Sequence, residues 1–339
     1  MLKTLDSNKK DFEKKLNYFL SKRREIQKNK SKNVKLIIND IKKNGDKSLI
    51  KYEKKFSNVK GSIQNLKFSK KEIENLSKNI DSKLIKSIDL AFNRIKRFHE
   101  KQKQFSFRYK DKYKNMLCYK YIPLQSVGVY VPGGTASYPS TVLMNCIPAI
   151  VAGVKNIYLT TPSLGKKIDP AIVYAAKKCG VKEIYRVGGA HSIAAFTYGT
   201  KIFKKVDKIV GPGNAYVAAA KKEVFGEVGI DMVAGPSEIS VVADRTANPN
   251  WVASDLIAQA EHDVYAQSIL ISNNFKLIEQ VNICLKNQLR NLPKSKIAST
   301  SLQNYGLAIY CKKNKATADI INEIAPEHLE LYVKNYKNF

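Results

Sequence analysis

The 339-residue chain is 44% apolar and has a formal net charge of +30. Its length allows two domains with separate cores, because single cores stop growing near about 250–300 residues, and its apolar fraction excludes a disordered protein. No apolar stretch approaches the roughly 18 residues of a membrane span, and the first residues lack the apolar run of a signal peptide, so we expect no association with a membrane.

The basic charge is concentrated near the N-terminus. Residues 1–120 hold 35 of the 59 Lys and Arg but only 13 of the 29 Asp and Glu. Only eight of the basic residues are Arg, whereas proteins that read nucleic acids favour the planar guanidinium of Arg. The charge therefore predicts non-specific attraction to nucleic acid at low salt and no dedicated nucleic-acid site.

The N-terminal third is predicted to be helical. Apolar residues recur at helical spacing in residues 12–20 and again in residues 84–95, and charged residues fill the other faces. We interpret residues 1–25 as an N-terminal helical segment, and the helical region extends to about residue 105.

The pattern changes near residue 120. From there to about residue 245, short β-branched runs alternate with glycine loops and alanine-rich helical stretches, as in IYLTT, EIYRVGG and KIVGPGN. That alternation predicts βαβ units with parallel sheets. Beyond Trp251 we expect a helix through His262, a strand at SILIS, a helix near residues 274–290, a strand at LAIYC and a helix from Thr317.

Five cysteines are dispersed along the chain without a CxxC pair: Cys118, Cys146, Cys179, Cys284 and Cys311. An odd and scattered set argues against a disulfide framework and favours a reducing compartment. Thiolate zinc sites need clustered sulfurs. We therefore expect a cytoplasmic protein with ordinary buried thiols.

Three glycine loops follow predicted strands: Gly133-Gly134, Gly188-Gly189-Ala190 and Gly211-Pro212-Gly213-Asn214. In an open α/β sheet, ligands bind beyond the carboxyl ends of the strands, and helix N-termini attract phosphates. Each loop by itself could simply be a tight turn. Three in succession favour a nucleotide-sized anionic ligand.

Two polar residues lie three positions apart on the predicted helix that ends near residue 262. Gln259 and His262 share one helix face and can reach one point in space. A neutral imidazole is a good zinc ligand, whereas a Gln carbonyl is an uncommon one. The spacing alone is equally compatible with a histidine on a helix surface.

A carboxylate stands beside an imidazole at Glu327-His328, directly after Pro326. Because Pro suits the first turn of a helix, we place both residues just inside a helix start. Adjacent helical residues point about 100° apart, so the pair could border one pocket as a base and a proton shuttle. The alternative is a solvated pair at a helix N-terminus.

Three further polar residues are less informative. Ser237, in the turn DMVAGPSE, lies at a predicted strand entrance and could bind a ligand or cap the turn. His191 follows a glycine loop at a predicted helix start and could face the same crevice as the loops. His99 lies among basic residues and is interpreted as a surface residue.

Together these stretches resemble the histidinol dehydrogenase family. The matching segments occur in the family's order and with similar spacing: VGVYVPGGTASYPSTVLMNCIPAIVAGV, VGGAHSIAAFTYGT, KIVGPGNAYVAAAK, IDMVAGPSEISVVAD, DLIAQAEHD and IAPEHLEL. The IDMVAGPSE segment is close to diagnostic of that family.

The resemblance implies a homodimer whose subunits contain two α/β domains related to incomplete Rossmann folds. It implies a discontinuous first domain of residues 26–129 with 238–339, which carries the zinc and acid-base residues. Residues 130–237 would form the second domain, on the NAD side. The implied reaction oxidises L-histidinol through the aldehyde to L-histidine, with hydride passing twice to NAD, as the last step of histidine biosynthesis.

The resemblance also implies roles for residues that match the family's motifs on the cofactor side. Tyr130 and Asn214 match residues that border NAD. His191 stands where the family usually has a Gln that binds NAD. Ser237 matches a residue that contacts the substrate.

The remaining matches concern zinc and proton transfer. Gln259 and His262 match zinc ligands that also touch the substrate. Glu327 and His328 match the acid-base pair, with His328 also in contact with the substrate. His328 would accept the alcohol proton, and Glu327 would activate the water that adds to the aldehyde.

The resemblance also implies a longer chain, because family members continue beyond Phe339. The continuation supplies an Asp and a His that complete the zinc shell, a Glu that contacts the substrate, and a tail that swaps into the partner subunit. Gln259 and His262 alone are half of a tetrahedral site. This chain, if natural and complete, is therefore expected to bind zinc weakly and to turn over histidinol slowly or not at all.

Two alternatives remain open at this point. One is a related alcohol dehydrogenase with another substrate. The other is an inactive, shortened remnant that acts as a basic binding protein.

Overall fold

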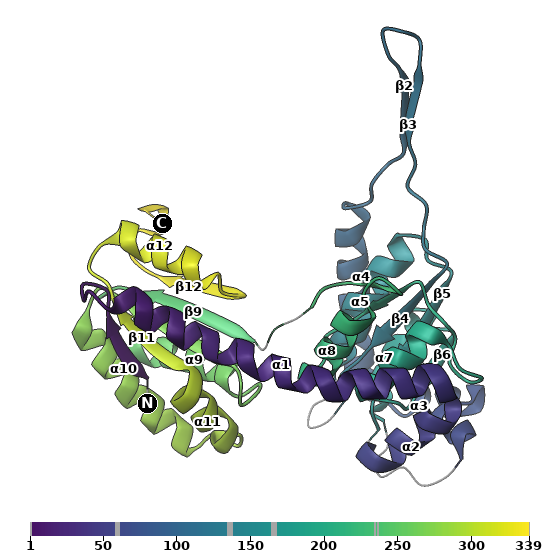
Figure 1. Ribbon diagram of the computed structural model, residues 1–339, viewed down its shortest axis with the longest axis horizontal. Helices are drawn as coiled ribbons and strands as arrows, with labels where there is room; N and C mark the ends of the chain where they lie inside the picture. The colour runs from purple at the N-terminus through teal and green to yellow at the C-terminus, as the bar shows by residue number, and fades with distance from the viewer. Residues whose placement is uncertain are drawn as a thin grey trace. The chain divides into compact units, whose positions relative to one another are not determined.

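A computed structural model describes residues 2–57, 62–133, 138–163, 168–233, 235 and 237–338. They form two compact units, Met1–Lys28 with Gly235–Phe339 (unit 1) and Asn29–Ala234 (unit 2). The described part of each unit contains a five-stranded parallel sheet, which confirms the predicted α/β class (Figure 1).

The division of the chain differs from the predicted one. The prediction joins residues 26–129 to residues 238–339, whereas the structure assigns the chain from Asn29 onward to the unit of the second sheet. The physical reason is packing, because apolar side chains in the second half of α1 (Phe12–Asn44) share one core with that sheet. The boundary therefore falls inside a helix, where a sequence pattern carries no signal.

The first residues belong to unit 1 and do not form a separate helical segment over residues 1–25. Strand β1 (Lys3–Asp6) pairs in parallel with β11 (Gly306–Tyr310). Phe12 and Leu16 at the start of α1 are buried in the same unit. A four-residue strand has too few positions to show a period, and its pairing comes from the tertiary structure.

The sheet of unit 2 has the strand order β6-β5-β4-β7-β8. Its strands are β4 (Ser126–Tyr130), β5 (Asn156–Thr160), β6 (Glu183–Tyr185), β7 (Lys208–Val210) and β8 (Gly229–Ile230). All five residues of β4 are buried, as expected for a central strand with helices on both faces.

Helices cover both faces of this sheet. One face packs against α3 (Lys70–Lys78), α4 (Ser82–Glu100), α5 (Pro139–Val151) and α6 (Pro170–Lys178). The other packs against α1, α2 (Asp46–Ser57), α7 (Gly189–Tyr198) and α8 (Ala215–Val224). Gly128 in β4 permits the close approach of α7, since an added Cβ would lie 2.8 Å from the Phe196 ring.

The connections of unit 2 create a switch point in the sheet. The chain leaves β4 toward α5 on one face and reaches β7 from α7 on the other, and β4 and β7 are neighbours. In such sheets, ligands bind in the crevice at the carboxyl ends of the two strands. Tyr130 is the last residue of β4 and Gly211 follows β7, so the topology directs attention to these loops.

The sheet of unit 1 has the strand order β1-β11-β10-β9-β12. Its other strands are β9 (Glu238–Ala243), β10 (Gln267–Ser272) and β12 (His328–Tyr332). One face packs against α9 (Pro249–Ala260), α10 (Phe275–Arg290) and α11 (Ser295–Tyr305), and the other against the start of α1 and α12 (Asn314–Ile324).

The predicted helix start at Glu327-His328 is wrong. Helix α12 ends at Ile324, and Ala325 adopts a left-handed conformation with φ of 46°. His328 is instead the first residue of β12, which pairs with β9. The left-handed residue and the following proline end the helix, so here Pro326 follows one helix and does not begin another.

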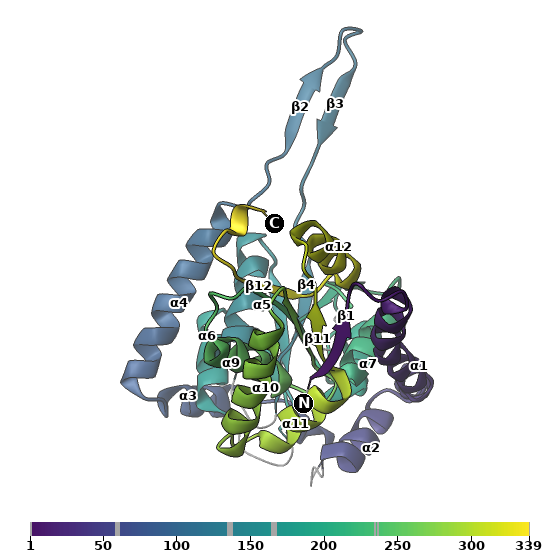
Figure 2. The same cartoon turned by 90° about the vertical axis from the view of Figure 1, so that its left-hand side faces the viewer.

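An exposed two-stranded hairpin was not anticipated. Strands β2 (Phe107–Lys110) and β3 (Met116–Tyr119) pair antiparallel and project away from the sheet of their own unit (Figures 1 and 2). Cys118 lies exposed on β3, which corrects the expectation that all thiols are buried. Short 3₁₀ helices occupy Ile63–Leu66 and Tyr336–Asn338. In the described part of the chain, no helix is both long and apolar enough to span a bilayer.

Candidate functional site

Tyr130 ends its strand at the switch point of unit 2. Its side chain is buried, and its phenolic oxygen accepts a hydrogen bond of 3.3 Å from the backbone N–H of Gly189. Burial raises the pKa of Tyr130 to about 12, and the nearby Glu53 carboxylate contributes. The phenol is therefore neutral at physiological pH and ties the end of β4 to the loop before α7.

The loop after β7 is held against Tyr130 by its own backbone. Gly211 has φ of 114°, and a Cβ added there would overlap the carbonyl oxygen of Tyr130. Its N–H donates to Asp231 Oδ2 at 2.8 Å, and its carbonyl accepts from Lys221 Nζ at 3.0 Å. Lys221 is buried and also forms an ion pair with Asp231. The first residue of the DMVAGPSE turn thus fixes the glycine loop.

Asn214 begins the helix that follows this loop. It is the N-cap of α8, and its Oδ1 accepts hydrogen bonds from the N–H groups of Tyr216 at 3.0 Å and Val217 at 3.2 Å. The residue is exposed at the carboxyl edge of the sheet. It is therefore placed beside any ligand that lies on the N-terminus of α8.

His191 does not lie open to the crevice. Its side chain is 3% exposed, and Nε2 lies 2.8 Å from Oε1 of Glu53, a fully buried residue of α2. The same carboxylate oxygen accepts from the N–H of Gly188 at 2.9 Å. The buried contacts of Glu53 with His191 and with the Gly188 N–H thus hold the Gly188-Gly189 turn in place. Sequence reasoning missed Glu53, because one Glu in a lysine-rich helix carries no signal.

The other glycine loops interlock through a proline. A Cβ added to Gly133 would lie 2.5 Å from the carbonyl oxygen of Pro162, and one added to Gly188 would lie 2.5 Å from Pro162 Cβ. The loops after β4, β5 and β6 therefore pack directly on one another. Gly134 lies outside the described residues.

The candidate residues of unit 1 lie at the amino ends of the strands in their sheet, whereas the glycine loops of unit 2 lie at the carboxyl ends in theirs. Ser237 precedes β9 and accepts a hydrogen bond of 2.9 Å from the N–H that begins β10, on Gln267. Glu327 precedes β12, and its Oε2 accepts from the N–H of Glu238 at 3.4 Å. His328 pairs in register with Ile239. All of these positions are at the amino ends of parallel strands.

Gln259 and His262 reach the same edge from a helix. Because α9 connects two parallel neighbours, β9 and β10, it must return the chain to the amino edge, and both residues lie at its end. His262 is exposed and donates its N–H to the Gln259 carbonyl at 3.2 Å. The Gln259 side chain is buried, and its Nε2 has no hydrogen-bond partner among the described residues. An orphaned buried amide suits a binding position.

The residues at hand do not complete a zinc site. Over residues 2–338, within the described ranges, no group of three or more His, Cys, Asp and Glu side chains could hold a metal ion. Gln259 and His262 supply two donors, whereas zinc in proteins takes three or four protein ligands. A zinc ion would therefore need ligands beyond those described.

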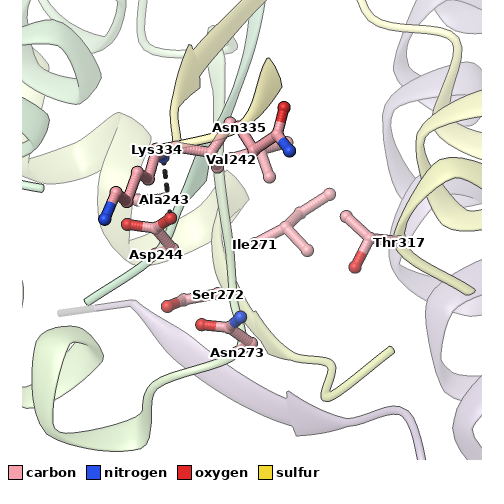
Figure 3. A pocket seen from close by; sticks show the side chains of 10 residues that line it. Val242, Ala243, Asp244, Ile271, Ser272, Asn273, Thr317, Lys334 and Asn335 are labelled. Atoms are coloured by element: carbon pink, nitrogen blue, oxygen red, sulfur yellow. Dashed lines mark hydrogen bonds between the residues drawn. The ribbon is translucent and has the colours of Figure 1, made fainter. Parts of the chain in front are cut away.

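Unit 1 also has a pocket of about 400 Å³ at the carboxyl ends of β9 and β10 (Figure 3). Figure 3 shows the apolar side chains of Val242 and Ile271 between polar ones that also line the pocket, among them Asp244, Ser272 and Thr317. Asp244 accepts from the N–H of Lys334 at 2.9 Å. This pocket lies at the other end of the strands from Ser237 and His328, so the predicted catalytic residues do not line it.

The described residues thus form two α/β units, one with glycine loops at the switch point of its sheet and the other with Glu327 and His328 at the amino edge of its sheet. A family model described as histidinol dehydrogenase matches residues 20–339. The chain is 55% identical over 338 residues to histidinol dehydrogenase of Pelagibacter ubique, covering 99% of this chain and 78% of that protein.

Two further comparisons agree. Histidinol dehydrogenase of Listeria monocytogenes is 47% identical over 306 residues, which cover 90% of this chain and 71% of that protein. The crystal structure of histidinol dehydrogenase from Elizabethkingia anophelis superposes with a TM-score of 0.86 at 36% identity, covering all of this chain and 77% of that one. The chain belongs to the histidinol dehydrogenase family and is an oxidoreductase of histidine biosynthesis. The comparisons do not support the alternative of an inactive remnant.

Proposed function

We propose that this chain oxidises L-histidinol to L-histidine with NAD, in the last step of histidine biosynthesis. The observation that carries the proposal is the family match together with Glu327 and His328 at the amino edge of the unit 1 sheet. The finer assignments below extend the family's reaction to the residues of this chain.

The glycine loops of unit 2 support the NAD assignment. Gly211 lets the loop after β7 pack directly against the backbone of Tyr130 at the switch point, where a Cβ would overlap the Tyr130 carbonyl oxygen. The N-terminus of α8 favours a phosphate group through the positive end of the helix dipole. Tyr130 and Asn214 would border the cofactor, while His191 would act by holding the Gly188-Gly189 turn. NAD, when bound, supplies the hydride acceptor.

The steps assigned to unit 1 are proton transfers. His328 accepts the alcohol proton while hydride leaves the carbinol carbon, which yields the aldehyde. Glu327 takes a proton from the water that adds to this aldehyde, and a second hydride loss from the hydrate yields the acid. In balance, one L-histidinol, two NAD⁺ and one water give L-histidine, two NADH and three protons. Ser237, Gln259 and His262 would contact the substrate at the same edge.

Gln259 and His262 are the residues of this chain that would hold a zinc ion, which would orient the nitrogen atoms of the substrate when bound, and they do not complete a site by themselves. Weak zinc binding by this chain remains a prediction. A calorimetric zinc titration should give a shallow isotherm, and His262→Ala should abolish the remaining heat. Tight one-to-one binding would contradict it.

The experiment that tests the activity uses the purified chain with L-histidinol and NAD. We expect absorbance from NADH to rise with two NADH for each L-histidine formed. A panel of other amino alcohols should react at least about tenfold more slowly, since a site built for polar groups rejects analogues that lack them. Equal turnover of simple alcohols would favour the related alcohol dehydrogenase instead.

The assembly and location are proposed from the same family resemblance. We expect a homodimer, and light scattering of the eluted protein should give twice the 38.2 kDa chain mass. A monomer mass would contradict it. A cytoplasmic location is supported by the five cysteines, all of which are unpaired in the structure.

A further inference from the structure

Unit 1 has a switch point of its own, between β9 and β12. The chain leaves β9 toward α9 on one face of the sheet and reaches β12 from α12 on the other, and β9 and β12 are neighbours. In open α/β sheets, ligands bind beyond the carboxyl ends of the strands at such a point. The pocket of about 400 Å³ lies there, because Asp244 follows β9, Lys334 follows β12, and both residues line it. The topology and the cavity therefore point independently to a ligand site.

The strands that border this pocket end level with one another. Ser272 at the end of β10 pairs in register with Ala243 of β9 and with Tyr310 of β11, and Ala243 pairs with Tyr332 of β12. A second pocket of about 530 Å³ lies along the ends of β10 and β11 and shares Asn273 with the first. Since neighbouring strands lie about 4.8 Å apart, the edge from β11 to β12 spans about 14 Å. A crevice of this length suits a nucleotide better than a single small ion.

The pocket at β9 and β12 has the lining of a nucleoside site. Val242 and Ile271 give it apolar surface, and in the view of Figure 3 Ile271 lies between Asp244 and Thr317. Pockets of this volume, lined by apolar groups and a few polar ones, are usual for small organic ligands. The apolar side chains suit the flat face of a base, and the exposed carboxamide of Asn335 can both donate to and accept from its edge.

Asp244 is oriented by its own loop and keeps an acceptor position for a ligand. Its Oδ1 accepts from the N–H and the hydroxyl of Thr246 at 2.8 and 2.5 Å, and its Oδ2 accepts from the N–H of Lys334 at 2.9 Å. An ionised carboxyl group has about four lone-pair sites, so these three bonds leave one on Oδ2. A ribose hydroxyl is a suitable donor, and an acidic residue binds the ribose in nucleotide-binding α/β folds.

The adjoining pocket at β10 and β11 is cationic. Among the described residues, the charged side chains that line it are Arg245, Lys276 and Lys312, and all three are exposed. Arg and Lys are the usual partners of phosphate groups, Arg through its planar fork and Lys as a point charge. The charge of this pocket therefore complements the phosphates of a nucleotide whose nucleoside occupies the first pocket.

We propose that this crevice of unit 1 binds a nucleoside polyphosphate. The nucleoside lies in the pocket at β9 and β12 with a ribose hydroxyl on Asp244, and the phosphates lie in the pocket at β10 and β11. The crevice is at the other end of the strands from Ser237 and His328, so its nucleotide is not the substrate of the proposed oxidation. The inference goes beyond the proposed function and does not depend on it.

Calorimetric titration of the purified full chain with ATP, adenosine and tripolyphosphate tests the proposal without L-histidinol. The titrations are made at physiological ionic strength, which screens the loose attraction of polyanions to exposed lysines. We expect ATP to bind at least about tenfold more tightly than either part alone, because only ATP fills both pockets. Tripolyphosphate that binds as tightly as ATP would overturn the proposal, since the lysines would then merely attract polyanions.

Two substitutions at exposed positions separate the two halves of the site. Asn335→Phe places a ring in the nucleoside pocket, so it should weaken ATP by at least about tenfold and leave tripolyphosphate unchanged. Lys312→Glu replaces a cation beside the phosphates by a negative charge, so it should weaken both ligands by at least about tenfold. Circular dichroism checks that both variants are folded. Unchanged ATP binding in either folded variant would contradict the proposed site.

Two controls distinguish this crevice from other sites on the chain. Lys286→Glu makes the same change of charge at an exposed position of α10 outside the described lining of both pockets, so ATP affinity should change by less than about twofold. Asn214→Ala alters the glycine loop of unit 2 and should leave ATP binding unchanged. If Asn214→Ala abolished ATP binding while Asn335→Phe preserved it, the nucleotide would occupy unit 2 and the proposal would be wrong. Equal losses in Lys286→Glu and Lys312→Glu would also overturn it.

Discussion

The two parallel sheets place their candidate groups at opposite ends and hold them in different ways. In unit 2 the glycine loops lie at the carboxyl ends of the strands and are fixed by polar pairs, the buried Lys221 with the partly exposed Asp231 and the buried His191 with Glu53. In unit 1 the amino ends carry Glu327 and His328, which are exposed. The same architecture thus supports a rigid loop site in one unit and accessible acid-base groups in the other.

The difference follows from solvation. A buried charge must be paired, and removing its partner leaves an uncompensated charge in the core. An exposed Glu or His keeps its water and needs no partner, so its position comes from the backbone of the strand. Substitutions in unit 2 should therefore reduce stability, whereas substitutions at the amino edge of unit 1 should reduce turnover with little change in stability.

The largest effect is expected from the acid-base pair, if the proposed function holds. His328→Asn and Glu327→Gln should each lower kcat by about 10²–10⁴-fold, the usual contribution of a positioned acid or base. Their free energies of unfolding should change by less than about 0.5 kcal/mol, as for exposed positions. Steady-state kinetics and urea unfolding measure the two quantities. If either variant lost much stability without losing turnover, the proposed contrast between the exposed residues of unit 1 and the buried pairs of unit 2 would be wrong.

The next largest effect, a loss of stability, is expected from breaking the Lys221–Asp231 ion pair that holds the loop after β7. Asp231→Ala removes the partner of Lys221, whose side chain is 3% exposed, and the acceptor of the Gly211 N–H. Breaking such a pair costs about 3–5 kcal/mol when both groups are buried, and less here because Asp231 is partly exposed, so we expect about 2–3 kcal/mol. Urea unfolding followed by circular dichroism measures it.

The control is a surface ion pair made by another residue of α8, the helix that carries Lys221. Glu223 pairs with Lys35, whose side chain is 65% exposed. Glu223→Ala should therefore cost less than about 1 kcal/mol. If the two variants lose equal stability, the buried pair does not fix the loop.

A smaller effect is expected at the turn before α7. Glu53→Gln keeps the size of the side chain but weakens the acceptor for Gly188 and His191, which should cost about 1–3 kcal/mol. In a double-mutant cycle with His191→Gln, the two substitutions should be non-additive by more than about 0.5 kcal/mol, since the side chains touch. Additive losses would mean that the contact contributes nothing.

The sequence predicted the class of fold and the candidate residues of unit 2, but it did not predict the charged residues that hold the loops of unit 2 in place. Strand-loop alternation was enough for the parallel sheets, because buried parallel strands are β-branched runs bounded by glycine. Tyr130 and Gly211 lie where the switch-point rule puts them. Glu53 and Lys221 could not be found, because their partners are far along the chain and nothing local distinguishes them from other charged helix residues.

The failures in unit 1 have a similar origin. The start of β12 resembled a helix start, because Pro is common both at the first turn and just after a helix end. The left-handed Ala325 that ends α12 is unusual for that residue type, and composition does not indicate it. The alternation of His328, Glu330 and Tyr332 fits a strand only once pairing with β9 is known.

The smallest effect concerns the pH dependence of unit 2. Asp40 of α1 accepts hydrogen bonds from Lys51 at 2.9 Å, Ser48 at 2.7 Å and Tyr52 at 2.9 Å, and these partners hold the pKa of Asp40 far below its ordinary value, the bond from Lys51 first. A carboxyl with a depressed folded-state pKa adds stability above its unfolded value, near pH 4, and that stability is lost as the pH falls below it.

Asp40→Asn should therefore cost about 1–2 kcal/mol at neutral pH and progressively less as the pH falls below about 4. Unfolding monitored by circular dichroism measures this difference. The single Trp251 lies on α9 of unit 1, so its fluorescence reports separately on the other unit. The variant should shift the circular-dichroism transition more than the fluorescence transition. Equal shifts would mean that the two units unfold together, and the contrast between them would then hold for their sites but not for their stabilities.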